Sequence, residues 1–143
     1  MTTFTLPWMQ DLGLAATEMD DDHRGLLDKL NALLIAISSQ DKTRLVMAIS
    51  TLRVAANEHF ATEEAQMRDL QYPDLEPHCE SHRRLLDGLS GLQVTLYVSE
   101  RFGAGMGPFA FLERWFVAHL THDDKRFAAF LAQRTPEVPA AAV

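Results

Sequence analysis

The chain has 143 residues, of which 47% are hydrophobic and 23% charged, a composition that excludes a disordered or membrane-spanning chain and predicts one globular domain. Thirteen lysines and arginines against twenty aspartates and glutamates give a net charge of -7, which argues against a nucleic-acid partner. Cys79 is the only cysteine, so an internal disulfide and multi-thiolate metal sites are excluded. We expect a cytoplasmic monomer with no membrane association.

The stretch from Leu26 to Tyr72 contains neither glycine nor proline and predicts two long helices, because a β-rich chain would need frequent turn residues. The first helix is expected from Thr17 to about Ser38. Asp41 is expected to cap the second helix, which ends before Tyr72. Apolar residues recur at spacings of three and four in both helices: Leu26, Leu30, Leu33, Leu34 and Ile37, then Leu45, Ile49, Leu52, Ala56, Phe60 and Met67.

A third helix is expected after Asp74, weakened in its middle by Gly88 and Gly91, each costing about 1 kcal/mol relative to alanine. The Gly-rich segment 103–107 predicts a flexible connection, and Pro108 suits the first turn of a fourth helix. Four helices with short joins predict an all-α, up-down-up-down four-helix bundle. We place the bundle at residues 17–133, with an N-terminal arm at 1–16 and a flexible C-terminal tail at 134–143.

Polar residues interrupt the apolar stripes at positions that face the core. Every predicted helix carries at least one such histidine: His23, His59, His78, His82 and His119. Glu63 follows His59, and His82 follows His78, at a spacing of four. Residues four apart differ by about 40° around a helix, so both side chains of such a pair can reach one point.

A multivalent cation explains this pattern better than separate buried histidines do. A single histidine at a core-facing position is usually a buried residue whose ring nitrogens are hydrogen-bonded, and His23 alone would be interpreted in that way. Burying five imidazoles and a carboxylate without partners would cost several kcal/mol each. The set has no thiolate and suits iron, manganese or zinc; it exceeds what one ion takes, so it predicts two ions and favours iron. The acidic run Asp20-Asp21-Asp22 is interpreted as a solvated first helical turn.

Taken in order, these residues resemble the hemerythrin family, in particular its single-domain bacterial members, the bacteriohemerythrins. The resemblance runs from Trp8 to about Phe130. It includes Asp20-Asp21-Asp22-His23, His59-Phe60-Ala61-Thr62-Glu63-Glu64, Tyr72-Pro73 before His78 and His82, and Trp115 before His119-Leu120-Thr121-His122-Asp123-Asp124.

The resemblance implies a non-haem di-iron centre, with two Fe ions bridged by an oxo or hydroxo group and by two carboxylates. The implied ligands are His23, His59, Glu63, His78, His82, His119 and Asp124. It implies that three histidines, His78, His82 and His119, complete one iron. His23 and His59 would hold the other iron, which keeps an open position for dioxygen.

The family pattern and ideal helix geometry disagree about one ligand. From His119, Asp123 is offset by about 40° and Asp124 by about 140° on a regular α-helix, so geometry alone chooses Asp123. The family's spacing assigns Asp124, which a bridging role or a local widening of the helix would accommodate. We follow the family and expect Asp123 to behave as a surface residue. His122 is expected beside the ligands or on the surface, and Cys79 is expected to be inert.

The implied function is reversible dioxygen binding for carriage, storage or delivery, in a protein that is not an enzyme. One alternative is a di-iron enzyme or stress protein that acts on peroxide or nitric oxide at the same irons. Another is an O2 or redox sensor, although sensing usually needs a signalling domain. The identity of any redox partner is left open by the sequence.

Overall fold

The computed structural model describes residues 17–98 and 107–134, with side chains over 19–94 and 110–134. The predicted N-terminal arm, most of the Gly-rich connection and the tail from residue 135 lie outside the described residues. The described part is entirely helical apart from short turns. Its elements are α1 (Thr17–Ser39), α2 (Lys42–Asp69), α3 (Leu75–Val98), α4 (Gly107–Ala118), the π-helix η2 (His119–Asp124) and α5 (Lys125–Arg134).

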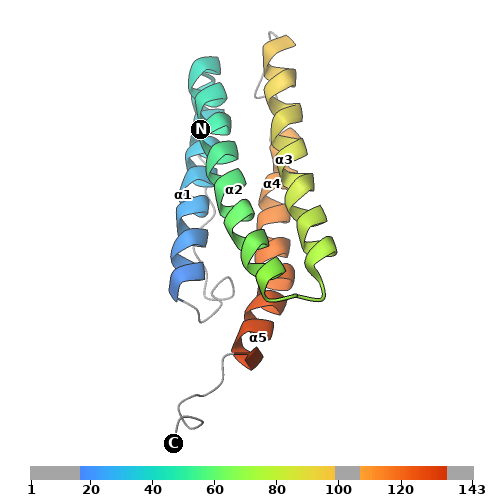
Figure 1. Cartoon of the computed structure of the whole chain (residues 1–143). Coiled ribbons are helices and arrows are strands. Elements are labelled where there is room, and N and C mark those ends of the chain that lie inside the picture. The colour runs from blue at the N-terminus through green and yellow to red at the C-terminus, as the bar shows by residue number, and fades with distance from the viewer. Residues whose placement is uncertain (1–16, 99–106, 135–143) are drawn as a thin grey trace, which may run out of the picture.

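Successive helices run in opposite directions, as Figure 1 shows, and α4, η2 and α5 follow one another without a break as the fourth rod of the bundle. This arrangement confirms the predicted up-down-up-down four-helix bundle. No helix in the described ranges is long and apolar enough to cross a membrane.

The turns after α1 and after α2 lie where the sequence predicted them. Gln40 adopts a left-handed φ of 56° after α1, and the Asp41 carboxylate then caps α2 by accepting a hydrogen bond from the Arg44 amide at 3.2 Å. At the other end of α2, Gln71 takes a φ of 55°. The Asp74 carbonyl accepts from the His78 amide at 3.2 Å in the first turn of α3.

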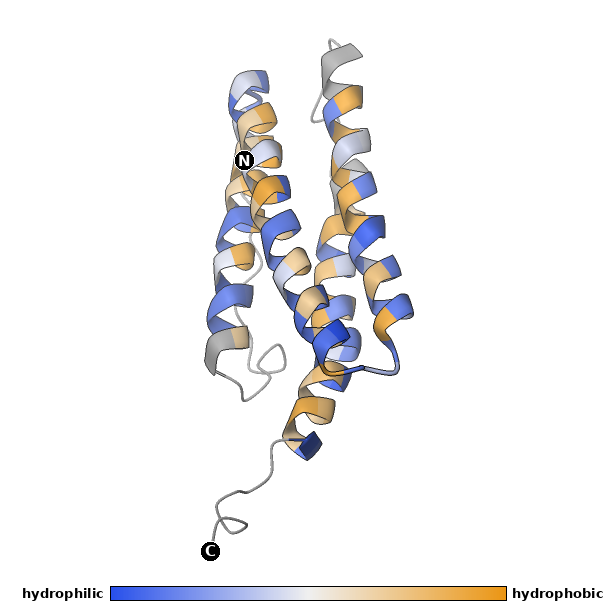
Figure 2. Ribbon diagram, viewed as in Figure 1, coloured by the Kyte–Doolittle hydropathy of each residue, from blue (hydrophilic) through white to orange (hydrophobic). Residues whose placement is uncertain are grey.

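The apolar stripes meet in one large core along most of the bundle. Figure 2 shows that each helix carries both hydrophobic and hydrophilic residues along its length, as amphipathic helices do. The side chains with 1% exposure or less in this core are Leu33, Leu34, Leu45, Ile49, Ala56, Leu89, Leu112 and Leu120. A second, smaller apolar cluster forms around Met67, Tyr72 and Phe127.

Gly88 has a packing role that its sequence position did not reveal. A β-carbon at this position would lie 2.6 Å from Cε2 of Phe111, so the missing side chain lets the α4 ring pack against α3. At Gly91 a β-carbon would meet open space. Helix α3 continues through both glycines, because the close approach at Gly88 offsets its low helix propensity.

Candidate metal centre

The seven predicted ligands lie together between the two apolar clusters, near the end of the bundle where α1 and α3 begin. His23 comes from α1, and the remaining six come in pairs from α2, α3 and η2: His59 with Glu63, His78 with His82, and His119 with Asp124. Six of the seven residues are 1–4% exposed. The His59 side chain is 13% exposed.

Five of these side chains converge on one point. The Nε2 atom of His78 lies 2.8 Å from Oε1 of Glu63 and 3.0 Å from Oδ1 of Asp124. The same Glu63 oxygen is 3.3 Å from Nε2 of His82, and the same Asp124 oxygen is 3.1 Å from Nε2 of His119. We call this the three-histidine group.

The other two histidines meet the same carboxylates from the opposite side. Nε2 of His59 lies 3.3 Å from Oε2 of Glu63, and Nε2 of His23 lies 3.0 Å from Oδ2 of Asp124. The two imidazole rings are edge to face, with centroids 5.2 Å apart. We call this the two-histidine group. Each carboxylate therefore directs one oxygen toward each group, which is the geometry of a bridge between two ions.

The donor atoms fit metal ions better than they fit one another. Among the described residues, His23 Nε2, His78 Nε2, Glu63 Oε1 and Asp124 Oδ1 are buried without a hydrogen-bond partner, although several of these atoms lie within 3.0 Å of one another. Nitrogen and oxygen ligands about 2.0–2.2 Å from an ion stand about 3 Å apart when they bind at right angles. The observed separations match that spacing, so the residues present fit a pair of ions.

The π-helix η2 explains how Asp124 reaches the centre. Five residues of a π-helix turn through about the same arc as four residues of an α-helix, so Asp124 faces inward five residues after His119. The local widening considered from the sequence is therefore confirmed. Asp123 also contacts His119, at 3.0 Å from the outer nitrogen Nδ1, which the sequence did not predict.

Polar residues outside the predicted set hold the outer nitrogens of two histidines. Nδ1 of His82 lies 2.7 Å from Oε2 of Glu64, and Nδ1 of His119 lies 2.9 Å from Oγ of Ser81. Trp115 donates from Nε1 to the Ser81 carbonyl at 2.9 Å. Such contacts fix the ring orientation and leave Nε2 free to face a metal. The sequence did not indicate Glu64 and Ser81 as partners of the candidate ligands, although each directly adjoins a predicted ligand.

Aromatic rings cover the three-histidine group. Phe60 stacks on His82 with centroids 3.8 Å apart and an interplanar angle of 3°. Trp115 stacks on His119 at 4.5 Å and 12°. These two rings exclude water from one face of the His82 ring and one face of the His119 ring.

Electrostatics in the metal-free centre keep the carboxylates charged and add a proton to an imidazole. Burial raises the pKa of Glu63 and of Asp124, but the histidine nitrogens that lie close to both carboxylates outweigh it and hold both pKa values far below the ordinary value. Burial lowers the pKa of His78, yet the adjacent Asp124 and Glu63 raise it to about 9. A metal ion would therefore displace a proton from His78 as it binds.

The remaining predicted residues lie at the margin of the centre. His122 is exposed, in agreement with one of its two expected positions, and Cys79 is half-buried. Asp22 is 64% exposed, as expected for a solvated first turn, but its Oδ2 lies 3.7 Å from Nδ1 of His59.

Comparisons with known proteins place these residues in context. Residues 14–131 match the family model described as the hemerythrin HHE cation binding domain. A bacteriohemerythrin of Stenotrophomonas maltophilia is 25% identical over 123 residues, covering 86% of this chain and 79% of that protein. Myohemerythrin-1 of Phascolopsis gouldii is 24% identical over 120 residues, covering 84% and 89%.

A crystal structure of a hemerythrin substitution mutant superposes with a TM-score of 0.78 at 22% identity. The match covers 87% of this chain and 95% of that one. At this identity the likeness shows a common fold.

Proposed function

The chain belongs to the hemerythrin family, and from the geometry of its centre we propose that the seven side chains hold two iron ions that bind dioxygen reversibly. The observation that carries the proposal is the orientation of Glu63 and Asp124, each of which directs one oxygen to each histidine group. When bound, a ferrous pair would supply two electrons to dioxygen and recover them when dioxygen leaves.

Unequal numbers of protein ligands support an open position on one side. The three-histidine group offers three imidazole nitrogens and two carboxylate oxygens, whereas the two-histidine group offers two nitrogens and two oxygens. Because iron in such an environment prefers six ligands, the two-histidine group has more room for an external molecule. We therefore assign the exchangeable position to the side of His23 and His59.

The residues around the centre favour binding over turnover. Phe60 and Trp115 pack directly on histidine rings and exclude water, which would slow the loss of electrons from a ferrous pair. Glu64, Ser81 and Asp123 are engaged with the outer nitrogens of histidines. We propose a monomeric carrier, storage or delivery protein for dioxygen.

The test is a spectrum of the reduced, iron-loaded protein as oxygen is admitted and then removed under vacuum. Metal analysis should approach two irons per chain, and a charge-transfer band should appear with oxygen and vanish under vacuum over repeated cycles. One ion per chain would contradict the di-iron assignment. One-way oxidation, or many turnovers of peroxide or nitric oxide with a reductant, would contradict the carrier assignment.

A further inference from the structure

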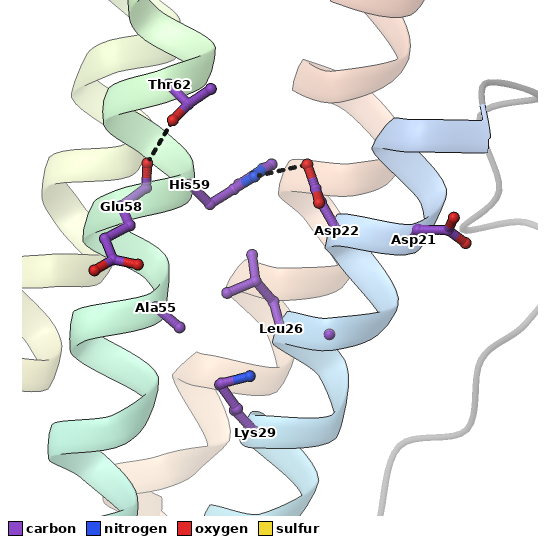
Figure 3. Close-up of a pocket in the computed structure, with 9 residues that line it drawn as sticks. Asp21, Asp22, Leu26, Lys29, Ala55, Glu58, His59 and Thr62 are labelled. Carbon is purple, nitrogen blue, oxygen red and sulfur yellow. Dashed lines mark hydrogen bonds and ion pairs between the residues drawn. The ribbon is translucent and has the colours of Figure 1, made fainter.

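His59 is the least buried of the seven candidate ligands, and its ring lines a surface cleft. Its side chain is 13% exposed, whereas the other six are at most 4% exposed. The ring lines a cleft of about 360 Å³ between α1 and α2, shown in Figure 3. The cleft therefore adjoins the two-histidine group, which offers fewer protein ligands.

Two small residues on α1 and α2 help to keep the cleft open. Gly25 on α1 and Ala55 on α2 both line it. A β-carbon built at Gly25 would have no atom of the described residues within 4 Å, so the described helices leave room on this side of the cleft. The volume far exceeds the roughly 10–15 Å³ that a cavity needs to hold one water molecule, so a diatomic molecule or a small anion fits.

His59 connects the cleft with the centre, because its ring lines the cleft and also contacts Glu63. Nδ1 of His59 faces Asp22 on the cleft side, at 3.7 Å, whereas Nε2 faces Glu63 inside the protein, at 3.3 Å. Leu26 lies beside His59 in Figure 3 and is 7% exposed. The two-histidine group is thus one ring away from solvent, while Phe60 and Trp115 cover the three-histidine group.

We propose that dioxygen and other small external ligands reach the centre from this cleft, past the edge of the His59 ring beside Leu26. The inference rests on the proposed di-iron function and adds the path by which the open position exchanges with solvent. The width of an access path sets the barrier to ligand entry and exit, and it does not change the free energy of the free or the ligand-bound protein. Narrowing it must therefore change the association and dissociation rates by the same factor.

Charges at the cleft distinguish neutral from anionic ligands. Among the described residues that line the cleft, Asp21, Asp22 and Glu58 are acidic and Lys29 is the one cation. This excess of carboxylates repels anions and leaves neutral molecules unaffected. Azide should therefore enter more slowly than its size alone predicts, whereas dioxygen should not be impeded by charge.

Gly25→Phe tests the path by filling the cleft, and Gly91→Phe is the matched control. Both glycines are helical, and at both a β-carbon meets open space, but Gly91 lies on α3 away from the cleft. We expect Gly25→Phe to slow dioxygen association and dissociation alike, by about fivefold or more, with an unchanged Kd and spectrum. Gly91→Phe should keep the original rates. Unchanged rates in Gly25→Phe protein that holds two irons would overturn the proposal.

Glu58→Lys supplies an independent arm that uses azide as the probe. Reversing this exposed charge should raise the rate of azide binding to the diferric protein several-fold at low salt and leave the dioxygen rate unchanged. An unchanged azide rate would show that azide does not pass the cleft and would overturn the proposal for anions. Azide binding does not require reversible oxygenation, so failure of the carrier function remains distinguishable from failure of the path.

Discussion

Asp124 is the residue through which η2 connects both halves of the centre. Its Oδ1 faces His78 and His119, and its Oδ2 faces His23. We expect Asp124→Ala to remove one ligand from each ion, to lower the iron content below two per chain and to abolish the oxygen-dependent absorption band. Iron analysis and absorption spectra of the purified variant would check this. Retention of two irons and of the band would contradict the role assigned to Asp124.

Asp123 contacts the outer nitrogen of His119, so its substitution should affect metal binding less than substitution of Asp124. The hydrogen bond to His119 Nδ1 holds the pKa of Asp123 below its ordinary value and fixes the ring. We expect Asp123→Ala to retain the band but to lower metal affinity by about 10–100-fold, the range found when a partner of a ligand is removed. A competitive chelator titration measures this. The exposed neighbour His122→Ala is the control and should keep the original affinity.

At the scale of the element, η2 acts as a one-residue insertion in an otherwise continuous helix. Removing one residue from a π-helix restores an α-helix and leaves the flanking segments in register. We expect deletion of the exposed His122 to yield a folded bundle in which Asp124 still faces the centre, now four residues after His119. Circular dichroism and iron analysis would show near-normal helix content and iron content.

Deletion of Ala61 is the matched control for this experiment. Ala61 is also exposed and also lies between two candidate ligands, His59 and Glu63, but within the regular α-helix α2. Its loss rotates Glu63 by about 100° relative to His59, so iron binding should be lost. If both deletion variants kept the same helix content and iron content, η2 would not tolerate the loss of a residue better than a regular α-helix does.

For the whole molecule, metal binding and folding should be strongly linked. Buried nitrogen and oxygen atoms of His23, Glu63, His78 and Asp124 have no hydrogen-bond partner within the described part of the fold. Bound metal would engage these atoms, apart from the outer nitrogen of His23, only in the folded state, so its removal should lower Tm by about 10 °C or more. Calorimetry of chelated and iron-loaded protein checks this. Identical melting temperatures would mean that these atoms do not share a metal.

As the pH rises, the stability of the metal-free protein should fall and its apparent affinity for metal should increase. In the folded chain the pKa of His78 is raised from 6.5 to about 9. The contribution of protonated His78 to the free energy of unfolding is therefore fully present below pH 6.5 and is lost as the pH rises through 9. Metal binding displaces the same proton, so apparent metal affinity should rise with pH over this interval. Denaturant unfolding and chelator competition at pH 6.5, 8 and 9.5 would test both trends.

Much of the fold was predictable because its determinants are local. Spacings of three and four among leucines predicted the helices, and Asp41 predicted the start of α2 through its side-chain cap. The role of Gly88 was not predictable, because it depends on Phe111 from another helix approaching within contact distance. A helical glycine looks the same in the sequence whether it only lowers the stability of the helix or also lets a side chain of another helix pack against it.

The centre was predictable to the extent that its residues interrupt apolar stripes. Histidines in core phase are conspicuous, and the structure brings all seven predicted residues together. Glu64, Ser81 and Asp123 were missed as partners of ligands because a polar residue outside a stripe looks like ordinary surface. The π-helix could not be derived from helix propensity, since only the spacing from His119 to Asp124 hinted at it.

The position of the centre between a large and a small apolar cluster divides the bundle into two parts that should open separately. The large cluster joins all four rods, whereas the small one around Met67, Tyr72 and Phe127 connects to it across the seven polar residues. Removing metal should therefore weaken the attachment of the small cluster first. In amide hydrogen exchange, the end of α2, the turn at 70–74 and α5 should lose protection as one unit. Amides beside Leu34, Ile49 and Leu89 should then exchange only through global unfolding.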